Sequence, residues 1–199
     1  MNTIRSTHIR EQIALYDPFN EQEERDKELI LGFMDSHEDV FSRSCLAAHM
    51  TASAWVTDSK RENILMAYHN IYNSWAWLGG HADGEEDLAS VAVREVMEES
   101  GIKNVRLLSD DIFSLESLTV DGHIKKGRYV SSHLHLNVTY LIEADETESL
   151  RIKKDENSAV AWISLNEVTS RSSEPWFNKH IYNKLNEKLL IWKREGLIN

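Results

Sequence analysis

Three glutamates, Glu95, Glu98 and Glu99, carry the clearest chemical signal in the sequence. At positions i, i+3 and i+4 they share one edge of a predicted helix, where like charges destabilise the helix rather than support it. A hard divalent cation would offset that repulsion, because Mg²⁺ prefers carboxylates together with waters and substrate phosphates as ligands. The spacing therefore predicts a metal site, with one carboxylate left to accept a proton from water.

The segments on either side of the glutamates define the helix that must position them. Asp87 is a plausible N-cap, and Gly101 stands where helices commonly end in a left-handed residue. Helical spacing predicts an apolar face made of Leu88, Ala89, Ala92, Val93, Val96 and Met97. The glutamates line the edge of this face, and Arg94 stands one turn before Glu98 and can hold it. The pair Gly79–Gly80 lets the backbone approach the same point, where a carbonyl could be a further ligand.

Composition excludes several classes of function. The chain has 199 residues with 33 acids, 22 bases and a formal charge of −11, which argues against a binder of nucleic-acid polymers or of anionic membranes. A small anionic substrate remains compatible, because a bound metal can reverse the local field. Cys45 is the only cysteine, so no internal disulfide can form. No apolar run reaches membrane-spanning length, and no secretion signal is recognisable, so we expect a cytoplasmic protein.

The N-terminal part of the chain has a helical residue pattern that differs from the pattern of the rest. Residues 4–45 look helical, with segments at Arg10–Tyr16 and Glu21–Met34 separated by a break at Pro18. We therefore predict a helical N-terminal extension over residues 1–45 and a main domain over residues 46–199. The extension could be a cap or lid, or an arm that forms a homodimer, and the sequence does not separate these two roles.

The main domain alternates strand-like and helical segments. Strands are predicted at Thr51–Thr57, Asn63–Tyr68, Trp75–Leu78, Ile112–Val120, Tyr129–Ala144 and Ala159–Ile163, with a turn at Asp58–Arg61 and closing helices at Leu165–Ser170 and Trp176–Glu195. Strands, a helix, more strands and final helices indicate an α/β protein with a mixed sheet packed between helices.

The glycine loop and the acidic helix together resemble a known family. The residues that carry the resemblance are Gly80, Glu86, Arg94, Glu95, Val96, Glu98, Glu99, Gly101 and Ile102. Their types and spacing match the Nudix box at every defining position, and the segments from about Thr51 to Val168 look like the rest of a Nudix domain. The resemblance implies an α/β/α sandwich and a Mg²⁺- or Mn²⁺-dependent hydrolase. Such an enzyme cleaves the diphosphate bond of a nucleoside diphosphate linked to another group X, by attack of water on phosphorus.

The resemblance also implies roles for individual residues. Glu98 and Glu99 should ligate the metal, the carbonyl of Gly79 could join them, and Glu95 should be a ligand or the general base. Arg94 should orient acidic side chains, including Glu86. The family often recruits one more acid from outside the box. We assign this role to Glu156, with Glu116 as the second choice.

Signals for substrate binding are weaker. Lys125, Lys126 and Arg128 form a basic group that is either a solvated hairpin tip or a phosphate clamp. His81 follows the glycine pair and could face the substrate. Trp77 precedes the pair and could stack on a base or pack in the core. His133 and His135 share one face of a strand, but two histidines without a third soft ligand nearby more often pack or bond to neighbours than bind metal.

Two other functions compete with the hydrolase. A Nudix-fold regulator would bind a nucleotide without cleaving it, but such a binder would tolerate loss of the box carboxylates, and this chain retains them all. An isoprenoid-diphosphate isomerase would need a cysteine near the glycine loop, whereas Cys45 lies well before that loop. The residues do not identify X. Its candidates include ADP-ribose and other nucleotide sugars, dinucleoside polyphosphates, oxidised nucleoside triphosphates and cofactor diphosphates.

Overall fold

The computed structural model of the protein describes residues 3–125 and 127–198. These residues form two compact units. The first comprises residues 3–52, 80–91, 111–125 and 127–139, and the second comprises residues 53–79, 92–110 and 140–198. The boundary expected between residues 45 and 46 stays a prediction. No helix in the described part of the chain is both long and apolar enough to cross a membrane, and the cytoplasmic location also stays a prediction.

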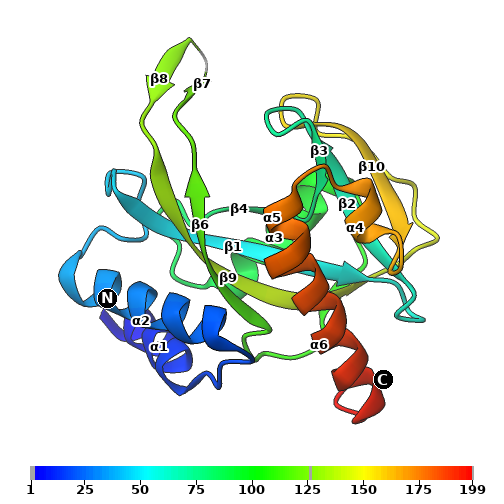
Figure 1. The fold of residues 1–199 in the computed structure, drawn as a ribbon, viewed down its shortest axis with the longest axis horizontal. Helices are drawn as coiled ribbons and strands as arrows, with labels where there is room; N and C mark the ends of the chain where they lie inside the picture. The colour runs from blue at the N-terminus through cyan, green and yellow to red at the C-terminus, as the bar shows by residue number, and fades with distance from the viewer. Residues whose placement is uncertain (1–2, 126, 199) are drawn as a thin grey trace. The chain divides into compact units, whose positions relative to one another are not determined.

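Eight strands pair into one sheet, with the order β10-β2-β1-β9-β5 and with β3 on β2, β4 on β1 and β6 on β9 (Figure 1). Their bounds are β1 Ala48–Thr57, β2 Asn63–His69, β3 Ser74–Ala76, β4 Leu78–His81, β5 Val105–Leu107, β6 Ser114–Val120, β9 His133–Ala144 and β10 Asn157–Ser164. β7 (His123–Lys125) and β8 (Arg128–Val130) form a separate hairpin. The predicted α/β architecture with a sheet and N-terminal helices is confirmed.

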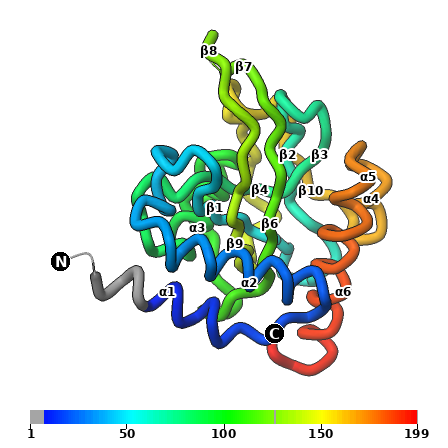
Figure 2. The backbone as a smooth tube through the Cα atoms, turned by 60° about the vertical axis from the view of Figure 1, so that its left-hand side comes forward, coloured from blue at the N-terminus to red at the C-terminus, as the bar shows by residue number. Residues whose placement is uncertain are grey.

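The first unit carries two N-terminal helices, α1 (Thr3–Leu15) and α2 (Glu21–Ser36). They lie side by side in two views (Figures 1 and 2), and α2 packs against β6. Asn20 caps α2 by accepting the Glu23 N–H at 3.0 Å, and Ile13 and Ile30 are fully buried. The predicted helical segments are confirmed up to residue 36, but the expected helix beyond it is wrong, since residues 37–47 form turns and bends.

The second unit contains the C-terminal helices and a cluster of aromatic rings. α4 (Val168–Arg171), α5 (Pro175–Phe177), the π-helical turn η1 (Asn178–Tyr182) and α6 (Asn183–Arg194) follow one another. The buried ring of Tyr182 stacks on Trp55 with 5.6 Å between centroids. Buried aromatic pairs contribute about 0.5–1.5 kcal/mol beyond the area that they remove from water. The bounds of α5, η1 and α6 confirm the helix predicted from residue 176 onward and show a π-helical turn in its first half.

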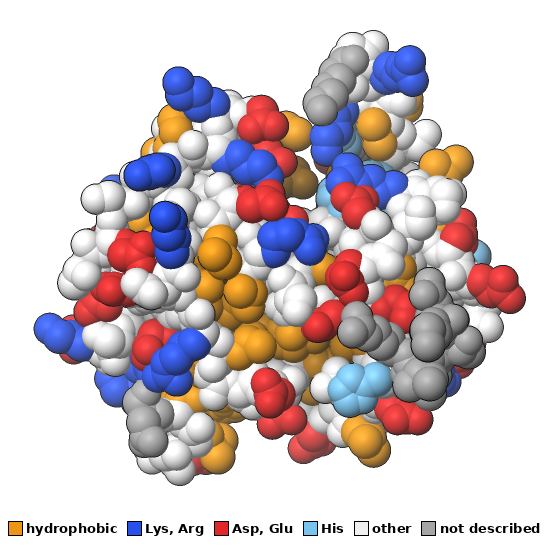
Figure 3. Space-filling view, turned by 180° about the vertical axis from the view of Figure 1, so that it is seen from behind, with side chains coloured by type: hydrophobic (Ala, Val, Ile, Leu, Met, Phe, Trp, Pro, Cys, Tyr) orange, Lys and Arg blue, Asp and Glu red, His pale blue; other side chains and the backbone are white. Residues whose placement is uncertain are grey.

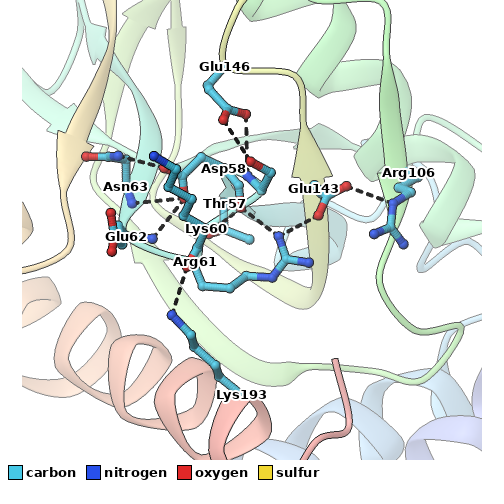
Figure 4. A network of polar contacts seen from close by, with 11 residues as sticks. Thr57, Asp58, Lys60, Arg61, Glu62, Asn63, Arg106, Glu143, Glu146 and Lys193 are labelled. Carbon is cyan, nitrogen blue, oxygen red and sulfur yellow. Dashed lines mark hydrogen bonds and ion pairs between the residues drawn. The ribbon is translucent and has the colours of Figure 1, made fainter. Parts of the chain in front are cut away.

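A polar network holds the turn between β1 and β2 in the second unit (Figure 4). Asp58 accepts the Glu62 N–H at 2.8 Å and the Asn63 amide at 2.6 Å, which confirms the turn predicted at this point. Arg61 has a positive φ of 63°, and its guanidinium reaches Glu143 on β9 at 2.5 Å. Lys193 on α6 donates to the Lys60 carbonyl at 2.8 Å. The turn is therefore tied to β9 and to α6.

Two predicted strands are interrupted. The strand expected at Trp75–Leu78 divides at Trp77 into β3 and β4, and the glycine pair lies inside β4 rather than after it. The long strand expected at Tyr129–Ala144 breaks at residues 131–132, between β8 and β9. β7 and β8 extend as a hairpin beyond the ends of β6 and β9 (Figure 1). The separate pairing of β8 with β7, rather than with the main sheet, accounts for this second break.

The acidic helix is α3 (Leu88–Ser100), and its ends match the prediction. Asp87 accepts the Ser90 N–H at 3.1 Å, as an N-cap does, and Gly101 follows the helix with φ 77°. Leu88, Ala92 and Val96 are buried as expected. Met97 does not belong to the buried face, since 39% of its surface is exposed, whereas the neighbouring Glu99 is buried.

Replacing Gly101 with alanine should destabilise the protein more than the same change at Gly196. Both glycines end a helix with positive φ, 77° and 71° respectively. A Cβ on Gly101 would lie 2.8 Å from the Arg151 Cβ, whereas a Cβ on Gly196 would meet nothing within 4 Å. We expect Gly196→Ala to lower the free energy of unfolding by about 1–2 kcal/mol through backbone strain alone. Gly101→Ala should cost roughly 1–3 kcal/mol more, from overpacking.

Urea unfolding of both variants and the wild type would measure the two costs. Equal losses would show that the approach of Arg151 to Gly101 imposes no constraint.

Candidate active site

Three carboxylates converge in the second unit. Glu95 and Glu99 come from α3, and Glu156 comes from the turn before β10. Each offers an oxygen, and these oxygens lie within 4.8 Å of one another. Glu99 is 5% exposed, and the other two are half-buried. The structure thus brings the acid expected from outside the box next to two acids of the box.

The turn that carries Glu156 is anchored to the end of α3. Asn157 is buried and donates its side-chain amide to the Glu99 carbonyl at 3.1 Å. The N–H groups of Glu156 and Asn157 donate to the Lys153 carbonyl, both at 2.8 Å. The last carbonyls of a helix have no partner within the helix, so Asn157 satisfies one of them and fixes the turn beside it.

Lys153 joins the cluster, although sequence reasoning missed it. Its ammonium lies 3.0 Å from the Glu98 carboxylate and 2.9 Å from the Glu156 carboxylate. The one available signal was its position three residues before Glu156. Arg94 lies 3.8 Å from Glu95. The described ion pair of Glu98 is therefore with Lys153 and not with Arg94, since the turn before β10 brings a cation within hydrogen-bond distance.

Gly79 touches the cluster through its amide. Its N–H donates to the Glu99 carboxylate at 3.2 Å. Gly79 and Gly80 lie within β4, and neither is among the residues with positive φ. In this structure the glycine pair therefore supplies a hydrogen-bond donor to a buried carboxylate, and a role for the Gly79 carbonyl as a ligand stays a prediction.

Crowding changes the proton affinity of the two α3 carboxylates. Burial, together with the nearby charges of Glu95 and Glu156, raises the pKa of Glu99 to about 8. Burial also raises the pKa of Glu95, and the charge of Glu98 adds to the effect. Partial burial disfavours the ammonium of Lys153, but hydrogen bonds to Glu156 and Glu98 outweigh it and raise the pKa of that lysine. Without a cation, burial and crowding therefore favour the protonated form of Glu99 and Glu95 over the charged form.

The other residues predicted for the site lie outside this cluster. Glu86 is half-buried before α3, and Arg128 is exposed on β8; both belong to the first unit. Lys126 lies outside the described residues. Trp77, in the second unit, packs edge to face on Phe177 and Tyr182, with centroids 6.3 and 6.0 Å apart, which favours packing over base stacking.

His81 and Glu116 also belong to the first unit. His81 lies among other histidines, and burial, followed by the charge of Arg43, lowers its pKa to about 3. The carboxylate of Glu116 is fully buried and accepts hydrogen bonds from Asn137 at 2.9 Å and Thr139 at 2.8 Å. Glu116 is thus a member of a buried polar network of the first unit.

The raised pKa of Glu99 predicts a pH-dependent stability of the metal-free protein. The pKa is 4.5 for the ordinary group and about 8 in the folded chain, so between these values the folded chain keeps a proton that the unfolded chain has released. The free energy of unfolding should then fall as pH rises, by about 1.4 kcal/mol per pH unit for one proton. Glu99→Gln removes this contribution, because glutamine does not titrate.

Urea unfolding with a chelator, at pH values about one unit apart between roughly 5 and 8, would measure the difference between wild type and Glu99→Gln. The exposed Glu187→Gln on α6 is the matched control and should follow the wild type. Parallel pH profiles for wild type and Glu99→Gln would show that Glu99 ionises normally in the folded chain.

Comparison with known proteins places this geometry in a family. A sequence profile of the NUDIX domain matches residues 47–185. An RNA pyrophosphohydrolase of Pelagibacter ubique is 31% identical over 123 residues, which is 60% of this chain and 77% of that protein.

Solved structures agree on the fold. The chain is similar to an Ap4A hydrolase of C. elegans in a binary complex, with a TM-score of 0.52 and 17% identity, over 73% of this chain and 98% of that one. It is also similar to a Nudix hydrolase of M. smegmatis, with a TM-score of 0.53 and 15% identity, over 72% of this chain and 86% of that one. With the profile match and the Pelagibacter relative, the chain belongs to the Nudix family and is a Nudix pyrophosphohydrolase.

Proposed function

We propose that the protein is a divalent-metal-dependent hydrolase that cleaves the diphosphate bond of a nucleoside diphosphate linked to another group, by attack of water on phosphorus. One observation carries the proposal: oxygens of Glu95, Glu99 and Glu156 lie within 4.8 Å of one another, at the helix that bears the family's motif. The substrate class follows from the family and from this oxygen-rich site.

The residues of the cluster fit Mg²⁺ or Mn²⁺. The donor set is made of carboxylates, which hard cations prefer, and the buried Glu99 lacks a full counter-charge. Glu99 and Glu156 of the cluster would hold the ion, with Glu95 and the Gly79 carbonyl as further candidates. Glu98 is not one of the three clustered acids, but it shares the Lys153 ammonium with Glu156 and is proposed as a ligand with them. When bound, such an ion neutralises charge on phosphoryl oxygens and lowers the pKa of a coordinated water.

The remaining chemistry falls to side chains of the chain itself. Glu95 is suited to accept a proton from the attacking water, because its pKa is raised by burial and 14% of its side chain is exposed. Arg94, 3.8 Å from Glu95, would orient this carboxylate, and we assign Glu86 the supporting role that the family resemblance implies. Lys153 would balance part of the negative charge while the substrate is absent.

Three basic or imidazole side chains outside the acidic cluster are the proposed contacts to the substrate. Arg128 is exposed near the tip of the β7–β8 hairpin, which suits a contact to a phosphate, and Lys126 stands beside it in sequence. His81 is the third proposed contact, from the strand that also contains Gly79. Trp77 remains a stacking candidate only if its packing against Phe177 loosens.

A small molecule is favoured over an RNA end as the substrate. The relative from Pelagibacter ubique is named for RNA, but this chain carries a formal charge of −11. On the face drawn in Figure 3, Lys and Arg side chains are interspersed with Asp and Glu and form no continuous basic surface. A polyanion would gain little electrostatic attraction from such a surface.

The decisive experiment is a hydrolysis screen with Mg²⁺ or Mn²⁺, using wild type, Glu98→Gln and Glu99→Gln. The substrates are ADP-ribose and other nucleotide sugars, dinucleoside polyphosphates, oxidised nucleoside triphosphates, cofactor diphosphates and a 5′-triphosphorylated RNA. We expect metal-dependent turnover of a small molecule. Both variants should lose roughly 100-fold or more, because loss of a ligand should exceed the 10- to 100-fold effect of outer-shell changes.

Glu187→Gln is the control and should keep full activity, and circular dichroism should show that all three variants fold. Wild-type turnover in Glu98→Gln and Glu99→Gln would contradict the site. Preference for the RNA would overturn the substrate class, and tight nucleotide binding without any turnover would favour the regulator.

Lys153→Gln should bind Mg²⁺ more tightly than the wild type does. The ammonium lies 3.0 and 2.9 Å from the carboxylates of Glu98 and Glu156 and competes with a cation for them. An ion pair of this partly exposed kind is worth up to about 1 kcal/mol, so we expect an increase of about fivefold in affinity by calorimetry. The exposed neighbour Lys154→Gln is the matched control. Weaker binding in Lys153→Gln would show that the lysine positions the carboxylates instead of competing for them.

A further inference from the structure

Four histidines form a second cluster, which shares no residue with the carboxylate cluster. They are His49 on β1, His81 on β4, and His133 and His135 on β9. Each offers a ring nitrogen, and these nitrogens lie within 4.8 Å of one another. All four residues belong to the first unit. The third ligand that the pair on β9 lacked in the sequence is thus supplied by other strands.

Backbone pairing brings the four rings together. The Leu134 N–H donates to the Ala47 carbonyl at 2.9 Å, which holds the start of β9 beside the start of β1. The Ala82 N–H donates to the Met50 carbonyl at 3.1 Å, which holds the end of β4 beside the same strand. Side chains alternate along a strand, so His133 and His135 share one face of β9. The cluster therefore depends on strand register and not on flexible loops.

His49 has one ring nitrogen prepared to act as a ligand. The residue is 5% exposed, and its Nδ1 lies 3.1 Å from the Cys45 carbonyl oxygen. A carbonyl can only accept, so Nδ1 carries the proton and Nε2 has a free lone pair. Within the described part of the chain this buried Nε2 has no hydrogen-bond partner. Leaving a buried acceptor unpaired costs about 1–3 kcal/mol, so the ring needs a partner that the protein does not supply.

The ring of His133 is held by the same kind of hydrogen bond to a backbone carbonyl. Its Nδ1 lies 2.8 Å from the Ser131 carbonyl oxygen, which leaves Nε2 as the acceptor. That Nε2 lies 3.2 Å from Nε2 of His135. Histidines that bind metal usually donate their second ring nitrogen to a carbonyl or carboxylate, which fixes the tautomer and the ring orientation. Two of the four rings therefore have the hydrogen bond that a metal ligand needs.

Ring packing alone explains less of this arrangement. The rings of His49 and His133 stack with 4.8 Å between centroids, and His81 meets His135 edge to face at 4.7 Å. Packing accounts for the proximity of the rings, and one hydrogen bond between His133 and His135 accounts for one pair of nitrogens. Packing and this hydrogen bond together still leave the buried Nε2 of His49 without a partner among the described residues. A cation at the centre of the four rings would satisfy that nitrogen together with the others.

We propose that His49, His81, His133 and His135 form a binding site for a late transition-metal ion of the Zn²⁺ class. Four imidazoles suit Zn²⁺, whose structural sites are tetrahedral, whereas hard Mg²⁺ prefers oxygen ligands. Zn–N bonds of about 2.1 Å separate the nitrogens of a tetrahedron by roughly 3.4 Å. Small ring movements would bring the nitrogens from their present limit of 4.8 Å to that spacing.

The site would join three strands of the first unit through one ion. Because β1, β4 and β9 each contribute at least one ligand, binding should stabilise the folded chain over the unfolded one. The proposal uses no carboxylate of the acidic cluster, and it shares only His81, proposed above as a substrate contact, with the hydrolase. Its test can therefore be read without any substrate.

Calorimetric titration of Zn²⁺ into chelator-treated protein, with Mg²⁺ in excess, tests the site. We expect one Zn²⁺ per chain in the wild type and in Glu99→Gln, together with a rise in the thermal unfolding temperature. Half-buried His133 is the residue to change, since His133→Gln should fold and should bind Zn²⁺ about 100-fold more weakly or worse. Co²⁺ as a second probe should show the visible absorption of a four-coordinate ion in the wild type and in Glu99→Gln, but not in His133→Gln.

His123→Gln is a closely matched control. His123 lies on β7 in the same unit, and its Nδ1 lies 2.9 Å from the carbonyl of the residue two positions before it, as in His133. It is not part of the cluster, so the variant should bind Zn²⁺ as the wild type does. Absence of Zn²⁺ binding in wild type, or unchanged binding in His133→Gln, would overturn the proposal. Loss of Zn²⁺ in Glu99→Gln with retention in His133→Gln would assign the ion to the carboxylates and would overturn it as well.

Discussion

The carboxylate of Glu99 imposes the strongest constraint on the site, because it is buried beside other carboxylates at the C-terminal end of a helix. The aligned peptide dipoles leave this end of α3 partly negative, so the helix adds to the repulsion instead of relieving it. Burial, followed by the charges of Glu95 and Glu156, raises the pKa of Glu99 to about 8, because its charged form is poorly balanced. A helix that only had to be stable would gain from a basic residue at this position.

The surrounding structure compensates for this charge only in part. The Gly79 N–H donates to the Glu99 carboxylate, and Lys153 pairs with Glu98 and Glu156. These partners come from β4 and from the turn before β10, which Asn157 ties to the last turn of α3. Gly101 ends the helix with a positive φ. Because Gly101 has no side chain, Arg151 can pack against its backbone. The arrangement is consistent with a site completed by a divalent cation.

The histidine cluster presents a different chemistry within the first unit. Its ligand atoms are imidazole nitrogens, whereas those of the acidic cluster are carboxylate oxygens. Hard and borderline cations discriminate between such donor sets, so the two clusters need not compete for one ion. Both clusters are assembled in the same way, since each combines two residues of one element with residues that are remote in sequence.

Local patterns in the sequence were sufficient for the elements and for part of the site. The cap at Asp87, the stop at Gly101 and the strands around them depend on interactions within a few residues, and the structure agrees with them. The grouping of Glu95 with Glu99 follows from helix periodicity alone. The family resemblance predicts one more acid outside the box, and only the folded chain shows Glu156 beside these two.

The tertiary structure decided what depends on contacts between distant segments. Lys153 joined the acids because a turn anchored by Asn157 meets the end of α3, and no local pattern encodes that meeting. Met97 is exposed while Glu99 is buried, because neighbouring segments, and not periodicity, set which edge of α3 is covered. His49 and His81 reached the pair on β9 through strand pairing. Chain periodicity determines which residues share a face, whereas the register of remote strands determines which faces meet.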